Sequence, residues 1–125
     1  MTALAHTATT LVENCRAGQD TANLDEIYDP GCVSVEAVKM GEAPREVAGL
    51  EAIRGKHQWW YDNFEVHSSS VEGPFLHGDD KFAVIFEMDT TMKATGERTQ
   101  MREVAIYTAN QDGKIIREEF FYGNP

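Results

Sequence analysis

The spacing of apolar residues predicts two helices near the start of the chain. In residues 3–17 apolar side chains recur three or four positions apart, which favours an amphipathic helix that ends at Gly18. Asp20 is the expected cap of a short second helix. The turn sequence Asp29-Pro30-Gly31 stops that helix, because proline and glycine both resist helix continuation. A first strand over residues 32–37 is expected next.

A loop and a long helix are predicted for the middle of the chain. Residues 39–49 hold two glycines, one proline and four charged residues, so this segment is expected to be a mobile loop and is the candidate lid. Helical spacing of apolar residues returns from Leu50 and ends near Asn63. It places Ile53 and Trp60 on one face of the helix, with His57 between them.

The second half of the chain has the composition of strands. Residues 65–77, 81–92, 98–109 and 114–122 are rich in β-branched and aromatic side chains. Turn sequences separate these segments, and Asp112-Gly113 is the strongest hairpin signal among them. Four long antiparallel strands in a meander are therefore predicted.

The order of these elements predicts a single α+β domain over residues 1–125, in which a curved sheet wraps the long helix. Gly73-Pro74 is expected to form a bulge that helps the sheet to bend. The predicted strands are apolar on both faces, and a sheet of that kind must be covered on both sides. Because the helices can cover only the concave face, the convex face is expected to pack against a second copy of the chain in a homodimer.

Charge and composition exclude several classes of partner. The 125 residues include 11 basic and 21 acidic side chains, and the net charge of −10 argues against binding to nucleic acid or to an anionic membrane. No apolar run approaches the roughly 18 residues of a membrane span, and the N-terminal residues lack the pattern of a signal peptide. Cys15 and Cys32 sit among apolar neighbours as small buried hydrophobes do. A cytoplasmic protein is expected.

The sequence contains no motif for a metal or a cofactor, so neither is expected. The four histidines are scattered without the spacing of metal ligands, and there is no glycine-rich phosphate loop or Ser-His-Asp pattern. His67 is predicted to enter the cavity from the first long strand, where an imidazole can shuttle protons. His57 has the pattern of a core histidine. The partner that remains is a small hydrophobic molecule.

Glu118 is an unusual polar residue for the last predicted strand. Side chains alternate between the faces of a strand, so Glu118 shares a face with Ile116 and Phe120. It can project into a ligand cavity, where it would titrate together with neighbouring carboxylates. The alternatives are a hydrogen-bonded core glutamate and an interface partner of Arg102 or Arg117.

Six large side chains are predicted to form the cavity wall and to contact the substrate. Such an apolar and aromatic lining favours a flat, hydrophobic ligand, whereas the alternative is plain core filling. The six residues are Trp60, Phe86, Met88, Tyr107, Phe120 and Tyr122.

Three segments of the chain resemble a known family. The sequences YDPGCVSVEA, GLEAIRGKHQWWYDNFEVHSSSVEGP and DGKIIREEFFYG are similar to the SnoaL-like and ketosteroid isomerase-like branch of the nuclear transport factor 2-like superfamily. The resemblance covers residues 5–123. It implies a cone-shaped, cystatin-like α+β barrel, and it is specific for fold but weak for activity, because the superfamily hosts several reactions.

The resemblance also implies roles for individual residues. In the isomerases an aspartate at the end of the first strand is the base, and counting from Tyr28 places that position at Glu36. A second, protonated aspartate on a later strand corresponds to Glu103. The tyrosine of the isomerases falls near Val12 and the acid–base aspartate of the cyclases at Phe120, so neither set is complete.

Two hypotheses for function remain open. The first is a cofactor-independent isomerase, cyclase or dehydratase that moves a proton next to a carbonyl in a small hydrophobic substrate. Glu36 would be the base, and Glu103 or Glu118 the acid or the donor to an enolate. His67 would assist. The second is a non-catalytic ligand-binding or dimerisation module of the same fold. From residue type alone, Glu36 can also be a solvated strand end, and Glu103 the partner of a basic neighbour.

Overall fold

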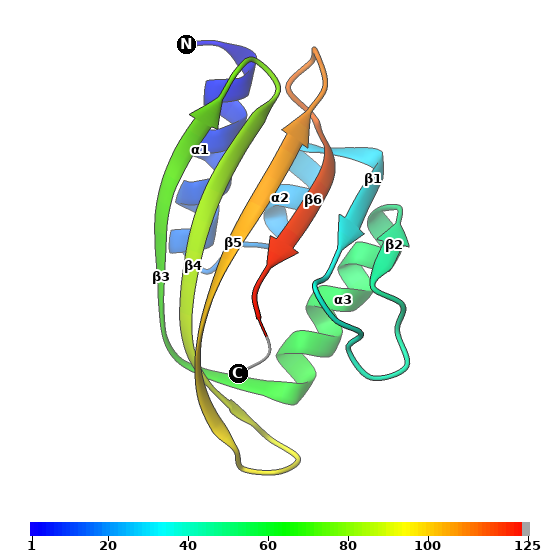
Figure 1. Ribbon diagram of the computed structural model, residues 1–125. Coiled ribbons are helices and arrows are strands. Elements are labelled where there is room, and N and C mark those ends of the chain that lie inside the picture. Colours follow the sequence, from blue (N-terminus) through cyan, green and yellow to red (C-terminus); the bar gives the residue numbers. More distant parts are fainter. Residues whose placement is uncertain (124–125) are drawn as a thin grey trace.

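The computed structural model describes residues 1–123, and its elements form a curved sheet with three helices on one side (Figure 1). The helices are α1 (Ala3–Arg16), α2 (Ala22–Glu26) and α3 (Leu50–Asn63). The strands are β1 (Tyr28–Val35), β2 (Glu46–Ala48), β3 (Phe64–His77), β4 (Lys81–Met92), β5 (Arg98–Ala109) and β6 (Ile115–Phe121). The predicted α+β class is confirmed.

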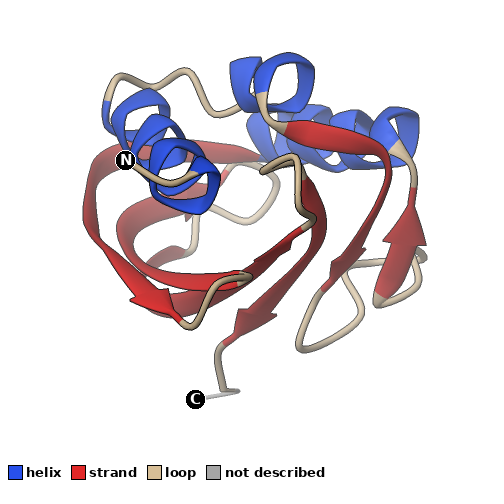
Figure 2. Ribbon diagram, turned by 90° about the horizontal axis from the view of Figure 1, so that it is seen from above, coloured by secondary structure: helices blue, strands red, loops and turns tan. Residues whose placement is uncertain are grey.

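The six strands form one sheet in the order β2-β1-β6-β5-β4-β3. All neighbours are antiparallel except β1 and β6, which run parallel. Seen from above, the sheet curls around a hollow and the helices lie across its concave side (Figure 2). The four strands of the predicted meander are present: β4 and β5 have the expected ends, and the ends of β3 and β6 differ from those expected by at most one residue.

Helix α1 closes one end of this hollow. The Thr2 hydroxyl caps it by accepting a hydrogen bond from the Ala5 amide at 3.0 Å. The Thr7 hydroxyl donates to the Gly113 carbonyl in the β5–β6 turn, which joins the helix to the sheet. Gly113 has a φ of 80°, and a Cβ there would lie 3.1 Å from the Ala3 carbonyl oxygen, so the turn requires glycine.

Three local predictions need correction. Strand β1 begins at Tyr28 rather than after the proline turn, because a register shift between Tyr28 and Val33 lets the strand accommodate that sequence. Thr21, not Asp20, occupies the cap position of α2. Part of the predicted loop 39–49 is strand β2, which pairs with β1.

The convex face of the sheet has no helix over it in either view (Figures 1 and 2). One row across it joins Ile85, Val104 and Phe121 on three neighbouring strands, since directly paired residues point to the same face. Phe75 and Phe121 on this face are both 48% exposed. The register shift between Glu72 and Phe75 confirms the predicted bulge in β3. Within residues 1–123, no helix is long and apolar enough to cross a membrane.

Candidate functional site

A cavity of about 830 Å³ lies between the concave face of the sheet and the helices. That volume is in the range of pockets that bind small molecules. All six side chains predicted to form its wall do line it, and Trp59 and Tyr61 join them at the same cavity. Tyr107 also serves the core, since its ring stacks on Phe82 with 4.8 Å between centroids.

Glu118 lies deep against the cavity and is 2% exposed. One carboxylate oxygen accepts from the Tyr28 hydroxyl, and the other accepts from the Ser34 hydroxyl at 2.8 Å. Burial raises the pKa of Glu118, while these two hydrogen bonds oppose the shift. Glu118 is therefore a hydrogen-bonded core glutamate that also borders the cavity.

The predicted arginine partners of Glu118 point elsewhere. Arg102 pairs with Glu72 and Glu87, on the convex side of the sheet. Arg117 pairs with Glu46 and Glu119. The hydrogen-bonded core environment, not an ion pair with either arginine, thus explains a carboxylate on the apolar face of β6.

Glu36 directly follows β1, and polar contacts hold both its side chain and its backbone. Its side chain forms an ion pair with Lys56, with 2.7 Å between Oε1 and Nζ, and accepts from the Tyr122 hydroxyl at 3.0 Å. Its backbone amide donates to the Arg45 carbonyl at 2.8 Å, and Arg45 Nε donates to the Glu36 carbonyl at 3.0 Å. Glu36 is thus a fixed cavity residue and not a solvated strand end.

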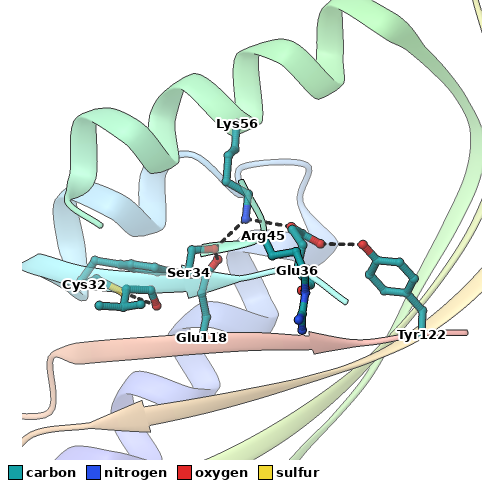
Figure 3. A network of polar contacts seen from close by, with 9 residues as sticks. Cys32, Ser34, Glu36, Arg45, Lys56, Glu118 and Tyr122 are labelled. Carbon is teal, nitrogen blue, oxygen red and sulfur yellow. Dashed lines mark hydrogen bonds and ion pairs between the residues drawn. The ribbon is translucent and has the colours of Figure 1, made fainter. Parts of the chain in front are cut away.

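Lys56 joins the Glu36 and Glu118 ends of this polar network (Figure 3). It extends from α3, and its Nζ lies 2.7 Å from Ser34 Oγ as well as 2.7 Å from Glu36 Oε1. Sequence reasoning missed it. The signal was available, because Lys56 follows Ile53 by three positions and so lies on the same side of the helix.

Glu103 lies on β5 opposite Phe86 and faces the cavity. Burial is the main cause that raises its pKa from 4.5 to about 7, and the negative charges of Glu36 and Glu118 add to the effect. The nearby charge of Lys56 acts in the opposite direction. Within residues 1–123, no hydrogen bond or ion pair joins the Glu103 side chain to another residue. The alternative of a basic partner for Glu103 is therefore not what the structure shows.

The structure places both histidines of interest differently from the prediction. His67 does not line the cavity: it is exposed on β3, with Nε2 2.6 Å from Thr91 Oγ1. Its predicted placement is wrong. His57 does line the cavity, and its Nδ1 lies 3.1 Å from Thr21 Oγ1. Burial, helped by the charges of Lys56 and Arg54, lowers the pKa of His57 to about 4, so its imidazole is neutral at pH 7.

The cavity wall holds a further group of polar side chains that sequence reasoning overlooked. Asp20 lines the cavity there together with Cys15 and Asn23. Burial raises the pKa of Asp20 and raises that of Cys15 to about 12, so Cys15 stays a thiol. Across residues 1–123, no three His, Cys, Asp or Glu side chains are grouped to hold a metal ion.

Comparison with known proteins identifies the family. A model of the SnoaL-like domain matches residues 5–122. The chain belongs to the SnoaL-like domain family. A protein of Mesorhizobium loti, whose name gives both a SnoaL-like polyketide cyclase and a carbohydrate phosphatase, is 41% identical to this chain. The TM-score is 0.88, and the match covers 98% of this chain and 100% of that one. No protein of curated function matches the chain.

Two more distant structures share the fold of this SnoaL-like chain. The Δ5-3-ketosteroid isomerase of a Mycobacterium species is 15% identical, with a TM-score of 0.71 over 98% of this chain and 95% of that one. A Mycobacterium tuberculosis protein solved in complex with estradiol-17β-hemisuccinate is 16% identical, with a TM-score of 0.74 and the same coverage. At these identities the likeness shows the fold alone.

The SnoaL-like chain lacks two side chains that its family resemblance would lead one to expect. Val12, near which the resemblance places the isomerase tyrosine, is 2% exposed in the core. Phe120, at the position of the cyclase aspartate, lines the cavity. The polar groups that line the cavity include Glu36, Lys56 and Glu103 instead.

Proposed function

We propose that this protein catalyses cofactor-independent proton transfer next to a carbonyl group in a small hydrophobic substrate. The observation that carries the proposal is Glu103, a carboxyl group without a protein partner among residues 1–123, set in an apolar cavity with a pKa of about 7. A group that titrates near the working pH both accepts and donates protons readily. Isomerase and cyclase relatives are consistent with this class of reaction.

Glu103 is the carboxyl group best suited to exchange a proton with a ligand. Both oxygens of Glu36 already accept from Lys56 and Tyr122. Both oxygens of Glu118 already accept from Tyr28 and Ser34. We therefore assign proton transfer to Glu103, and to Glu36 and Glu118 the supply of negative charge that raises its pKa.

The proposed reaction is a proton shift without a covalent intermediate. The Glu103 carboxylate removes a proton from the carbon beside the carbonyl, the C–H electron pair becomes a C=C bond, and the carbonyl π electrons move to oxygen. The protonated Glu103 then returns the proton to a carbon of the enolate. The aromatic wall of Trp60, Phe86 and Tyr107 holds the ring system and keeps water away.

Hydrogen exchange in 2-tetralone, a flat fused-ring ketone, tests the proposal. In D₂O the wild type is expected to speed deuterium incorporation beside the carbonyl, as followed by NMR. Glu103→Gln removes the proton acceptor, so most of the enhancement, about 10²- to 10⁴-fold for a general base, should be lost. Glu87→Gln, an equal change on the convex face, is the control. Equal rates in wild type and Glu103→Gln would contradict the proposal.

The second candidate is a non-catalytic binding module that uses the same cavity. The incomplete isomerase and cyclase sets at Val12 and Phe120 favour it. A relative's complex with estradiol-17β-hemisuccinate shows that a protein of this fold holds a hydrophobic ring system. Tight binding of 2-tetralone with no exchange above background would support this candidate instead.

We also propose that the convex face forms a homodimer. Its apolar rows include Phe75, Ile85 and Phe121, and no element of residues 1–123 covers them. Charges of both signs lie beside these rows, where Arg102 pairs with Glu72 and Glu87. A second copy related by a two-fold axis can therefore bury the apolar rows and pair these charges.

We also propose a cytoplasmic location. Free Cys15 and Cys32 support a reducing compartment of this kind.

A further inference from the structure

Lys56 provides the positive charge of an otherwise acidic cavity. Five carboxyl groups line the cavity, and among residues 1–123 Lys56 is the one lysine or arginine that does so. The five are Asp20, Glu36, Glu42, Glu103 and Glu118. The Lys56 side chain is 19% exposed, so little water surrounds its charge. An ammonium group held in this setting has a stronger electrostatic effect than one on the surface.

The ammonium group of Lys56 is held at two points. Its Nζ donates to Glu36 Oε1 and to Ser34 Oγ, each at 2.7 Å (Figure 3). The Ser34 hydroxyl donates its proton to Glu118, so its oxygen is free to accept a hydrogen bond from Lys56. The directions of these hydrogen bonds are thereby fixed: Lys56 donates to Glu36 and to Ser34, and Ser34 donates to Glu118.

One N–H bond of Lys56 remains uncommitted. A lysine ammonium carries three donors, and two of them are used by Glu36 and Ser34. No third acceptor for Lys56 is present within residues 1–123. The ammonium lies over the Phe120 ring in a cation–π contact, with 5.4 Å between the ring centroid and Nζ, and both residues line the cavity. No oxygen or nitrogen atom of residues 1–123 accepts the third N–H, so a ligand oxygen in the cavity can accept it in place of the ring contact.

We infer that Lys56 binds the oxygen of the substrate and stabilises the negative charge that forms there. Its third N–H donates to the carbonyl oxygen, and the hydrogen bond strengthens as the neighbouring carbon loses its proton and the oxygen becomes an enolate. Glu36 and Ser34 are positioning residues that hold the ammonium in place. The inference rests on the proposed function for the kind of substrate, and it adds that the ligand carries an oxygen acceptor on a hydrophobic ring system.

A purely structural role for Lys56 would give a different pattern of binding. If Lys56 only neutralised Glu36, its removal would disturb the cavity and weaken every hydrophobic ligand alike. If it binds oxygen, only ligands that carry the oxygen should lose affinity. Two ligands of the same size separate these cases: 2-naphthol, whose skeleton and oxygen position match 2-tetralone, and naphthalene, which lacks the oxygen.

The test compares the affinities of wild type, Lys56→Met and Lys81→Met for 2-naphthol and naphthalene. Loss of a hydrogen bond from a charged group should weaken 2-naphthol binding to Lys56→Met about 10- to 100-fold and leave naphthalene binding unchanged. Lys81 lies on the surface beside Asp80, so Lys81→Met makes the same change of charge outside the cavity and should match wild type.

NMR of the wild type provides a second measurement that does not depend on a folded variant. The Lys56 ¹⁵Nζ resonance should shift when 2-naphthol binds and stay in place with naphthalene. Equal weakening of both ligands, no weakening of 2-naphthol, failure of wild type to bind it, or an unmoved resonance overturns the inference. The exchange assay with Glu103→Gln is independent of these results, so the proposed function can fail or survive separately.

Discussion

At the scale of single residues, the chemistry of the cavity follows from how each carboxyl group is partnered. Glu118 and Glu36 have all four of their oxygens engaged by hydroxyl or ammonium donors. Glu103 meets the same apolar surroundings without a donor from residues 1–123, and its pKa is raised to about 7. Burial of a carboxyl group disfavours its charged form unless donors replace the lost water.

The raised pKa of Glu103 predicts that this residue makes stability fall as pH rises. Its pKa is 4.5 when unfolded and about 7 when folded, so the folded state binds more protons between these values. The stabilisation is complete below pH 4.5 and is lost as pH rises through 7, by on the order of 3 kcal/mol. Urea unfolding of wild type and Glu103→Gln from pH 4 to 8 measures it.

Comparison of these two proteins isolates Glu103 from other titrating groups. His57, whose pKa is lowered to about 4, acts in the opposite direction, but it is present in both proteins. The stability advantage of wild type over Glu103→Gln should therefore shrink across this range. Parallel stability curves would show that Glu103 titrates normally.

Residue-scale reasoning from sequence was limited by what alternation can show. Alternation placed Glu118 at the cavity, and the family resemblance placed Glu36 and Glu103 there. Alternation failed for His67, since the register of β3 shifts between Val66 and Ser68 and the alternation is interrupted at that point. A bulge of this kind has no reliable sequence signal apart from glycine or proline.

At the scale of elements, helix α3 is the part of the fold that builds the site. Only Ile53 on α3 is fully buried, while Lys56, His57 and Trp60 on the same side face the cavity. The helix therefore lies across the concave side of the sheet and borders the cavity (Figure 2). Sequence periodicity predicted its ends, Leu50 and Asn63, but could not distinguish a face that packs from a face that lines a cavity, because both are apolar.

Local sequence patterns predicted the long strands but not the features that depend on tertiary packing. The four strands of the meander were predicted because their patterns are long and their turns carry glycine. The short strand β2 was missed, since three residues, Glu46–Ala48, are too few to show a period. The contact of Lys56 with Ser34 joins residues 22 positions apart and depends on the packing of α3 over β1, which no local pattern encodes.

At the scale of the whole molecule, the exposed convex face predicts a change of oligomeric state on mutation. Phe121 belongs to the row with Ile85 and Val104, and a charge there would be buried without a partner in the proposed dimer. Sedimentation velocity should give the mass of a dimer for the wild type and the mass of a monomer for Phe121→Glu. Leu76→Glu, an equally exposed apolar residue off this row, should remain a dimer. A monomeric wild type would contradict the proposal.

The protonation of Glu103 depends on its burial in the cavity of the curved sheet and on the neighbouring carboxyl groups. Titration of the Glu103 side-chain carboxyl by ¹³C NMR in the intact wild-type protein is the most direct measurement of this arrangement. We predict a midpoint at about 7, because burial and the charges of Glu36 and Glu118 disfavour the ionised form of Glu103. A midpoint near the ordinary value of about 4.3 would place Glu103 in water and contradict the proposed chemistry.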